Sequence, residues 1–149
     1  MQSYKIKPPT YLLVAIILIV VLHFNLPVIV LIPAPWTLFG ILPLVLGIVI
    51  SVQADQLFHE VDTPVSPFDN SSVLVICGPY RYTRNPMYLG FTLILLGVSI
   101  LAGSLMPFVV VLAFALLMDR LFIQMEERKL AATFGVQWEA YKRQTRRWL

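Results

Sequence analysis

The chain has 149 residues, 58% of them hydrophobic, and a formal net charge of +3. Its mean hydropathy of +0.81 exceeds what a soluble core requires, which excludes an ordinary soluble domain and indicates a membrane protein with one domain. The single cysteine, Cys77, excludes an internal disulfide, and the positive charge fits anionic lipid headgroups, so no nucleic-acid partner is expected.

Charged residues are missing from two long windows of the sequence. Residues 8–54 and 85–118 contain no Asp, Glu, Lys or Arg, and these windows are 47 and 34 residues long. Because a membrane helix needs about 20 apolar residues, each window accommodates two spans joined by a turn. We therefore predict an all-α integral membrane protein with four transmembrane helices in two hairpins.

All 11 Lys and Arg residues lie outside the two windows, so they share one side of the bilayer if each window is a hairpin. Because cytoplasmic loops are enriched in Lys and Arg, this side is assigned to the cytoplasm. We expect a multi-pass protein of the cytoplasmic (inner) membrane with both termini cytoplasmic. The first apolar run is too long for a signal peptide and lacks a small-residue cleavage site, so it should be retained.

The first hairpin is expected over residues 1–58. Its first span should cover about residues 11–32, a run rich in Leu, Ile and Val, with Pro27 kinking its outer end. His23 is the only ionisable side chain inside either window. Because no acid faces it within the spans, we expect a neutral histidine that hydrogen-bonds to a neighbouring helix.

The first hairpin should turn at the proline-rich residues 33–36. The second span then covers about residues 37–58, in which Gly40 and Gly47 offer small positions for contact with another helix. A cytosolic loop is expected over residues 59–85, because prolines and other turn-forming residues punctuate it.

The second hairpin and the C-terminal helices occupy residues 86–149. The third span should cover residues 86–101, and at 1.5 Å per residue its length is about 24 Å, less than a hydrocarbon core of about 30 Å. The polar residues at its start should therefore sink below the membrane surface. The fourth span should cover residues 105–123 and end at Asp119 and Arg120, which we interpret as an interfacial pair capping the helix.

The third span opens with Asn85 and Pro86. Asparagine is a preferred N-cap and proline suits the first helical position, so the pair predicts a helix start. With Arg81 and Arg84 just upstream, this start offers unpaired N–H groups and positive charge to an anionic group. The alternative, that the pair only caps the helix and the arginines contact lipid headgroups, is equally consistent with this stretch.

The fourth helix should continue out of the membrane to Phe134, with Gly135 as its C-terminal cap. A second, amphipathic helix is predicted over residues 137–147, with Trp138 and Tyr141 on its apolar stripe. We interpret it as a membrane-surface helix held by anionic lipid through its basic face. The basic residues are Lys142, Arg143, Arg146 and Arg147.

Two sequence blocks carry a specific resemblance. The first reads Gly-Pro-Tyr-Arg at residues 78–81 and Arg-Asn-Pro-Met-Tyr-Leu-Gly at residues 84–90, where it opens a membrane helix. The second follows one helical hairpin later and consists of Glu126, Glu127, Leu130, Phe134, Gly135, Trp138 and Tyr141. In this order, and each at a membrane boundary, the blocks resemble the isoprenylcysteine carboxyl methyltransferase and phospholipid methyltransferase group of integral-membrane enzymes.

The resemblance implies a single membrane methyltransferase domain over residues 1–149, acting on a lipophilic acceptor at the cytoplasmic membrane interface. It implies S-adenosyl-L-methionine as cofactor, no metal, and catalytic roles for Arg84, Glu126 and Glu127. The residues expected to bind the cofactor are these three with Cys77, Gly78, Pro79, Tyr80, Asn85, Pro86, Tyr88 and Gly90. Asn85 stands where a histidine is usual, so any role that needs an imidazole proton is lost.

The residue types also suit this cofactor on chemical grounds. An arginine and a helix start suit its carboxylate, a glutamate its amine or ribose hydroxyls, and a tyrosine its ring. An alternative is a small four-span transporter or scaffold without enzymatic activity, although a transporter usually carries a charged group mid-membrane. A nicotinamide-dependent lipid reductase would need a glycine-rich fingerprint, which the sequence lacks. The acceptor and the oligomeric state are left open.

Overall fold

The computed structural model describes residues 7–26, 29–60 and 72–149, and within them the secondary structure is helical apart from isolated bridges. The elements are α1 (Pro8–Asn25), η1 (Trp36–Gly40), α2 (Ile41–Glu60), η2 (Gly78–Arg81), α3 (Pro86–Ala102), α4 (Leu105–Met118), η3 (Asp119–Ile123), α5 (Gln124–Phe134) and α6 (Val136–Gln144). The all-α prediction is confirmed for this part of the chain. The expected kink at Pro27 and much of the expected loop lie outside the described residues.

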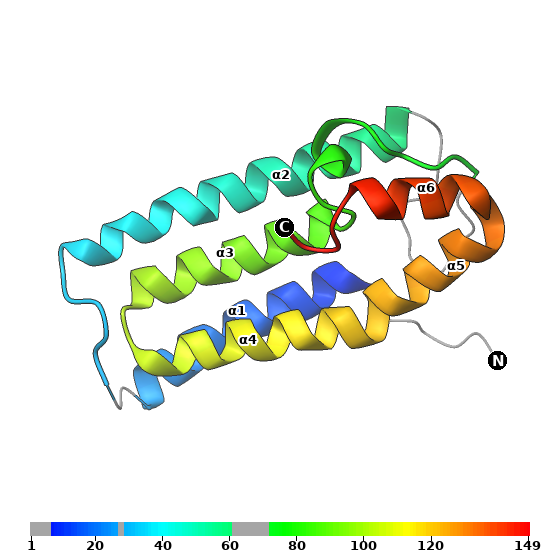
Figure 1. Cartoon of the computed structure of the whole chain (residues 1–149). Coiled ribbons are helices and arrows are strands. Elements are labelled where there is room, and N and C mark those ends of the chain that lie inside the picture. Colours follow the sequence, from blue (N-terminus) through cyan, green and yellow to red (C-terminus); the bar gives the residue numbers. More distant parts are fainter. Residues whose placement is uncertain (1–6, 27–28, 61–71) are drawn as a thin grey trace.

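Helix α3 lies at the centre of the bundle (Figure 1). Helix α2 packs along one side of it, and α1 and α4 pack along the other. As a result α3 buries more of its residues than α1, α2 or α4 does. The expected first hairpin is open, because α1 packs against α4 and α3 while α2 packs against α3.

Glycines set the close packing of α2 against α3. A Cβ atom added at Gly47 would lie 2.5 Å from the carbonyl oxygen of Gly90 and 2.8 Å from the backbone nitrogen of Ile94. One added at Gly40 would lie 2.4 Å from the carbonyl oxygen of Gly97. The prediction that Gly40 and Gly47 are helix-contact positions is therefore confirmed, and Gly90, expected at the cofactor, faces α2.

Replacing Gly47 with alanine should lower the free energy of unfolding by about 1–2 kcal/mol. The new methyl group meets backbone atoms that cannot rotate away, and this overpacking outweighs the helix propensity that alanine gains. Unfolding of the purified protein by denaturing detergent measures the change. The control is Val52→Ala on the exposed face of α2, for which we expect a change of no more than about 0.5 kcal/mol. Equal stability of the two variants would contradict close packing at Gly47.

The connections at one end of the bundle, residues 29–36 and 103–104, are bonded to each other. The N–H groups of Leu31 and Ile32 donate to the carbonyl of Gly103 at 2.8 and 3.0 Å, and His23 Nδ1 lies 2.9 Å from Ser104 Oγ. We call this the turn end. The expected hydrogen bond of His23 is thus confirmed. The expected end of the first span at residue 32 is wrong. Helix α1 ends at Asn25, and the N–H groups of Leu31 and Ile32 bond to the other connection instead of continuing the helix.

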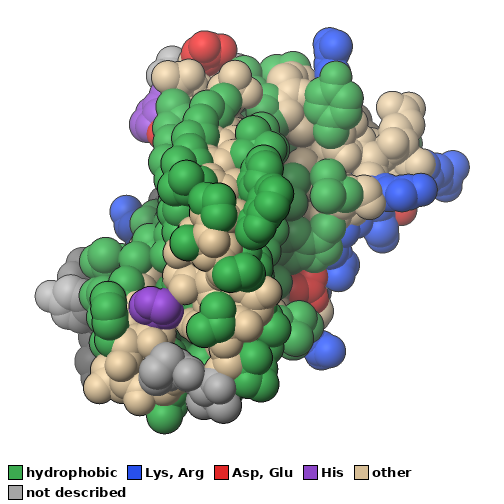
Figure 2. All heavy atoms as spheres, turned by 90° about the vertical axis from the view of Figure 1, so that its left-hand side faces the viewer, with side chains coloured by type: hydrophobic (Ala, Val, Ile, Leu, Met, Phe, Trp, Pro, Cys, Tyr) green, Lys and Arg blue, Asp and Glu red, His purple; other side chains and the backbone are tan. Residues whose placement is uncertain are grey.

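The opposite end carries residues 72–85, α5 and α6, and we call it the charged end (Figure 1). Between the ends, three apolar helices of the described chain are long enough to cross a membrane: Pro8–Asn25, Trp36–Glu60 and Leu105–Phe134. Figure 2, which views the turn end, shows hydrophobic side chains over this face, with Lys and Arg at the outline of the view. Such an apolar surface is typical of a membrane protein.

The C-terminal helices fold back onto the protein. Helix α4 continues through the π-helical turn η3 into α5, which ends at Phe134. Gly135, with φ +48°, follows as its C-cap, so the expected cap is confirmed. Helix α6 then packs inward, with Trp138 2% and Tyr141 8% exposed. The interpretation of this stripe as a membrane-surface contact is therefore wrong, because protein atoms cover it. The helix also ends at Gln144, earlier than expected.

Candidate active site

The loop before α3 is joined to the segment that follows α6. The backbone N–H of Arg84 donates to the carbonyl of Arg146 at 2.9 Å. The Thr83 hydroxyl and the Asn85 side-chain amide both donate to the carbonyl of Arg147, each at 3.0 Å. Asn85 does occupy the N-cap position of α3, but its side chain makes no capping bond. The expected capping role of this side chain is wrong, because it anchors the C-terminal segment.

Four charged side chains form a network at this junction. Glu127 lies between two arginines: Arg84 Nη2 is 3.0 Å from its Oε1, and Arg147 Nη2 is 2.6 Å from its Oε2. Arg147 Nη1 also lies 3.3 Å from Asp119 Oδ1. The hydrogen bond to Glu127 raises the pKa of Arg147 above its usual value, so this guanidinium stays charged. The sequence interpretation of Asp119 as one of an interfacial pair with Arg120 missed this longer-range partner.

Arg84 is engaged on every side of its guanidinium. Besides Glu127, it donates to the carbonyls of Lys142 and Thr145 at 3.1 and 3.0 Å. Its Cζ also lies 5.8 Å from the ring centroid of Trp138, within the range of a cation–π contact. With its side chain only 9% exposed, Arg84 clamps α5, α6 and the C-terminal segment together. Its expected contact with an anionic cofactor group would require these bonds to rearrange.

The two adjacent glutamates face different partners. Glu126 accepts a hydrogen bond from the hydroxyl of Tyr88, which comes from the first turn of α3, at 2.5 Å. The Tyr88 ring is buried and stacks on Phe122 at 6.3 Å. Glu127 instead faces the C-terminal segment, since successive helical residues point about 100° apart. The pair therefore serves two neighbouring sites and connects α3 and the C-terminal segment through α5.

The expected cofactor residues 77–80 form a platform under α6. Gly78 has φ +55°, a conformation that glycine adopts at little cost, and it opens the short helix η2. The buried Tyr80 accepts a hydrogen bond at its carbonyl from the hydroxyl of Tyr141 at 2.7 Å. Burial raises the pKa of Tyr141 above its usual value, so its hydroxyl stays a donor. Pro79 lies within η2, whereas Cys77 is exposed.

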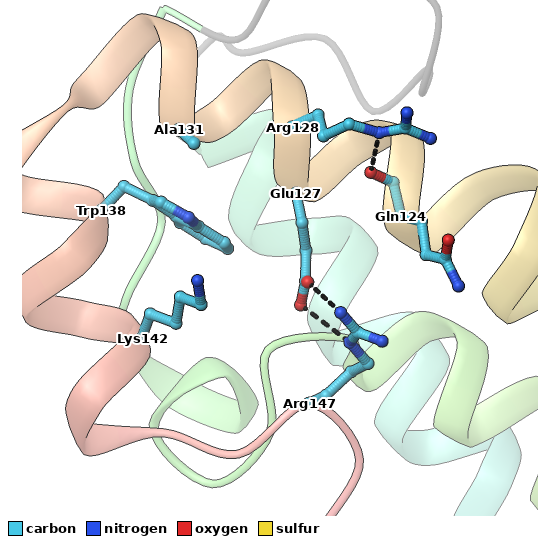
Figure 3. Close-up of a pocket in the computed structure, with 7 residues that line it drawn as sticks. All are labelled: Gln124, Glu127, Arg128, Ala131, Trp138, Lys142 and Arg147. Carbon is cyan, nitrogen blue, oxygen red and sulfur yellow. Dashed lines mark hydrogen bonds and ion pairs between the residues drawn. The ribbon is translucent and has the colours of Figure 1, made fainter.

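A cavity of about 530 Å³ opens beside Glu127 (Figure 3). Trp138 and Lys142 reach into it from α6, opposite Glu127 and Arg147. It is lined by Gln124, Glu127, Arg128, Ala131, Trp138, Lys142 and Arg147. Of these seven lining residues, the sequence predicted only Glu127 as a site residue. Lys142 and Arg147 were interpreted as part of a basic face that binds anionic lipid, and only the apolar stripe of α6 signalled that this helix packs inward.

Comparison with known proteins places this fold in a family. Residues 35–137 match the phospholipid methyltransferase family. A protein-S-isoprenylcysteine O-methyltransferase of Schizosaccharomyces pombe is 36% identical over 95 residues, which are 62% of this chain and 38% of that relative. An uncharacterized protein of Haemophilus influenzae is 36% identical over 63 residues, 42% of this chain and its own full length.

The chain thus spans well under half of the S. pombe relative. No solved structure matches this chain significantly. The family match runs from the residue before η1 into α6, so it includes α3, both glutamates and the loop that carries Arg84. The resemblance inferred from the two sequence blocks is confirmed, and the chain belongs to the phospholipid methyltransferase family.

Proposed function

We propose that the chain is an S-adenosylmethionine-dependent methyltransferase that acts on a lipophilic acceptor at the cytoplasmic membrane interface. The observation that carries the proposal is the cavity beside Glu127, at the charged end of an apolar bundle, where the matched family region supplies the α5 side of the lining. Its volume of about 530 Å³ lies within the range of small-molecule sites. Relatives named for phospholipid or isoprenylcysteine methylation support an acceptor attached to a lipid.

The groups around the cavity suit this cofactor. Glu127 offers carboxylate oxygens to an amine or to ribose hydroxyls, and Trp138 gives the cavity an aromatic wall that suits a ring. Lys142 and Arg128 bring positive charge that suits a carboxylate. The donor set therefore matches a ligand that combines a carboxylate, an amine, hydroxyls and a heteroaromatic ring.

When bound, S-adenosylmethionine supplies an electrophilic methyl group on a sulfonium. Methyl transfer is an in-line displacement, so the chain contributes most by aligning the reactants and excluding water. Glu127 would add negative charge beside that cation, and Arg84 holds Glu127 in place through its ion pair. Tyr88 fixes Glu126 through its hydroxyl.

We retain the predicted site with a division of roles. Glu126 and Glu127 are proposed to face the cofactor, together with Tyr88. Arg84, expected to be catalytic, is proposed to act through Glu127. The remaining predicted residues are proposed to support the site through the loop and the start of α3: Cys77, Gly78, Pro79, Tyr80, Asn85 and Pro86. Gly90 is proposed to set helix packing.

We further propose that all 149 residues form one domain with four spans and that both termini are cytoplasmic. Helix α3 has 17 residues, about 26 Å, and its central place in the bundle supports a span shorter than the bilayer core. A short α3 holds the site near acyl-chain depth. We therefore propose that the acceptor enters sideways from the cytoplasmic leaflet.

The proposed orientation predicts opposite labelling of the two ends. Cys77 is exposed at the charged end, and Ala34 is exposed at the turn end. A membrane-impermeant thiol reagent should label Cys77 from the cytoplasmic face only. In a Cys77→Ser background, Ala34→Cys should be labelled from the other face only. Labelling of both positions from one face would contradict the four-span arrangement.

The activity is tested with purified protein in lipid bilayer discs, cofactor labelled in its methyl group, and a membrane lipid extract. We expect label to enter the organic phase, where the product can be identified by mass spectrometry. Glu126→Gln should slow this transfer by about ten-fold or more, since it replaces the carboxyl group that Tyr88 orients. Arg143→Gln on the exposed face of α6 should not. Absence of both transfer and cofactor binding would favour a transporter or scaffold.

A further inference from the structure

Arg147 joins three parts of the candidate site: α5, η3 and the loop before α3. Its side chain contacts Glu127 on α5 and Asp119 on η3, and its carbonyl accepts hydrogen bonds from Thr83 and Asn85. It lies outside both sequence blocks and beyond the matched family region. We propose that Arg147 is a positioning residue that orients the carboxylate of Glu127 for cofactor binding. This inference rests on the proposed function.

The two arginines contact the oxygens of Glu127 in different ways. Oε1 receives Arg84 through Nε and Nη2 at 3.1 and 3.0 Å, and it also receives Arg147 Nε at 3.2 Å. Oε2 receives Arg147 Nη2 at 2.6 Å. Arg147 therefore bridges both oxygens as a planar fork, which fixes the rotation of the carboxylate plane. Arg84 alone holds one oxygen and leaves this rotation free.

A second acid fixes Arg147 from the other side. Asp119 Oδ1 lies 3.3 Å from Arg147 Nη1, and Asp119 Oδ2 accepts a hydrogen bond from the Gln124 side chain at 2.8 Å. Asp119 begins the π-helical turn η3, and such turns often occur at functional sites. Gln124 therefore positions Asp119, Asp119 positions Arg147, and Arg147 positions Glu127. All of these except Asp119 line the cavity.

Side-chain and backbone roles of Arg147 can be separated by substitution. The hydrogen bonds from Thr83 and Asn85 go to its carbonyl oxygen, which every substitution retains. The carbonyl of the neighbouring Arg146 also accepts a hydrogen bond, from the backbone N–H of Arg84, and Arg146 is exposed. Arg147→Gln therefore removes the fork and leaves the segment anchored, and Arg146→Gln is a control with the same change of charge.

The test is calorimetric titration of S-adenosylmethionine into the full chain in bilayer discs. Arg147→Gln should weaken binding by about ten- to a hundred-fold, the effect of losing a charge-assisted bond. Arg147→Lys should fall between this variant and the wild type, because it keeps the charge without the fork. Arg146→Gln should stay within about two-fold of the wild type. In turnover measurements, Arg147→Gln should raise the KM for the cofactor and leave the KM for the acceptor unchanged.

A double-mutant cycle separates positioning from a merely structural effect. In a Glu127→Gln background, Arg147→Gln should change affinity by less than about three-fold, because the group that it orients is gone. Asp119→Asn should weaken binding by a smaller factor than Arg147→Gln. Additive losses in the cycle, or equal binding by Arg147→Gln and Arg146→Gln, would overturn the inference while the proposed function stands. A wild-type chain that binds no cofactor would overturn both.

Discussion

Exchanging Glu127 for glutamine should lower the free energy of unfolding by about 3 kcal/mol. The substitution leaves Arg84 and Arg147 facing each other without the carboxylate between them, and removing one partner of a buried ion pair costs about 3–5 kcal/mol. The lower end of this range applies because the Arg147 side chain is 37% exposed. Thermal and detergent-induced unfolding of the purified protein measure the loss.

The same substitution should weaken S-adenosylmethionine binding by about ten- to a hundred-fold, if the carboxylate meets the cofactor as proposed. The matched control is Glu139→Gln on α6. Its carboxylate lies 3.7 Å from Lys142 Nζ and is 51% exposed, so its loss should change stability by less than about 1 kcal/mol. Wild-type stability and affinity in the Glu127 variant would remove this residue from both the network and the site.

Replacing Trp138 with alanine should be at least as damaging, with a loss of about 3–5 kcal/mol, as for other buried tryptophans. The side chain is 2% exposed, forms one wall of the cavity and lies under the guanidinium of Arg84. Its removal leaves a cavity and loosens α6 from the clamp that Arg84 forms. Unfolding measurements and the rate of proteolytic cleavage between α5 and α6 report the two effects.

The Trp138 substitution also separates two roles for α6. If α6 lay on the membrane surface, the substitution would weaken lipid binding and leave the stability of the bundle unchanged. If α6 is docked on the protein, the substitution destabilises the bundle. The control is Val136→Ala at the start of α6, since Val136 is 87% exposed. We expect that control to stay within about 0.5 kcal/mol of the wild type. Similar values for the two variants would restore the membrane-surface interpretation.

Helix positions could be predicted from the sequence where a strong local signal exists. The charge-free windows located the apolar helices, Asn85 with Pro86 located the start of α3, and Gly135 located the end of α5. Each signal depends on neighbouring residues alone. The end of α1 escaped prediction, because it depends on backbone bonds from Leu31 and Ile32 to a turn about 70 residues away.

The site was predictable in part for the same reason. The motif blocks pointed to Arg84, Tyr88, Glu126 and Glu127, which the fold brings to one end of the bundle. The partners of these residues were not predictable, because Asp119 and Arg147 carry no motif and meet only after α6 reverses the chain. A basic residue near the end of a polar helix has the same sequence signal whether it is solvated or paired.

The bonded connections at the turn end determine where this bundle can move. Leu31, Ile32 and Gly103 tie the two connections backbone to backbone, and the His23–Ser104 contact adds a side-chain tie. With this end fixed, the turn end acts as a joint about which the helices can move apart. Displacements that admit a ligand should therefore grow with distance from the joint and be greatest where α5 and α6 close the cavity. Slow amide exchange at Leu31 and Ile32, with faster exchange along α6, would be the signature of this lever.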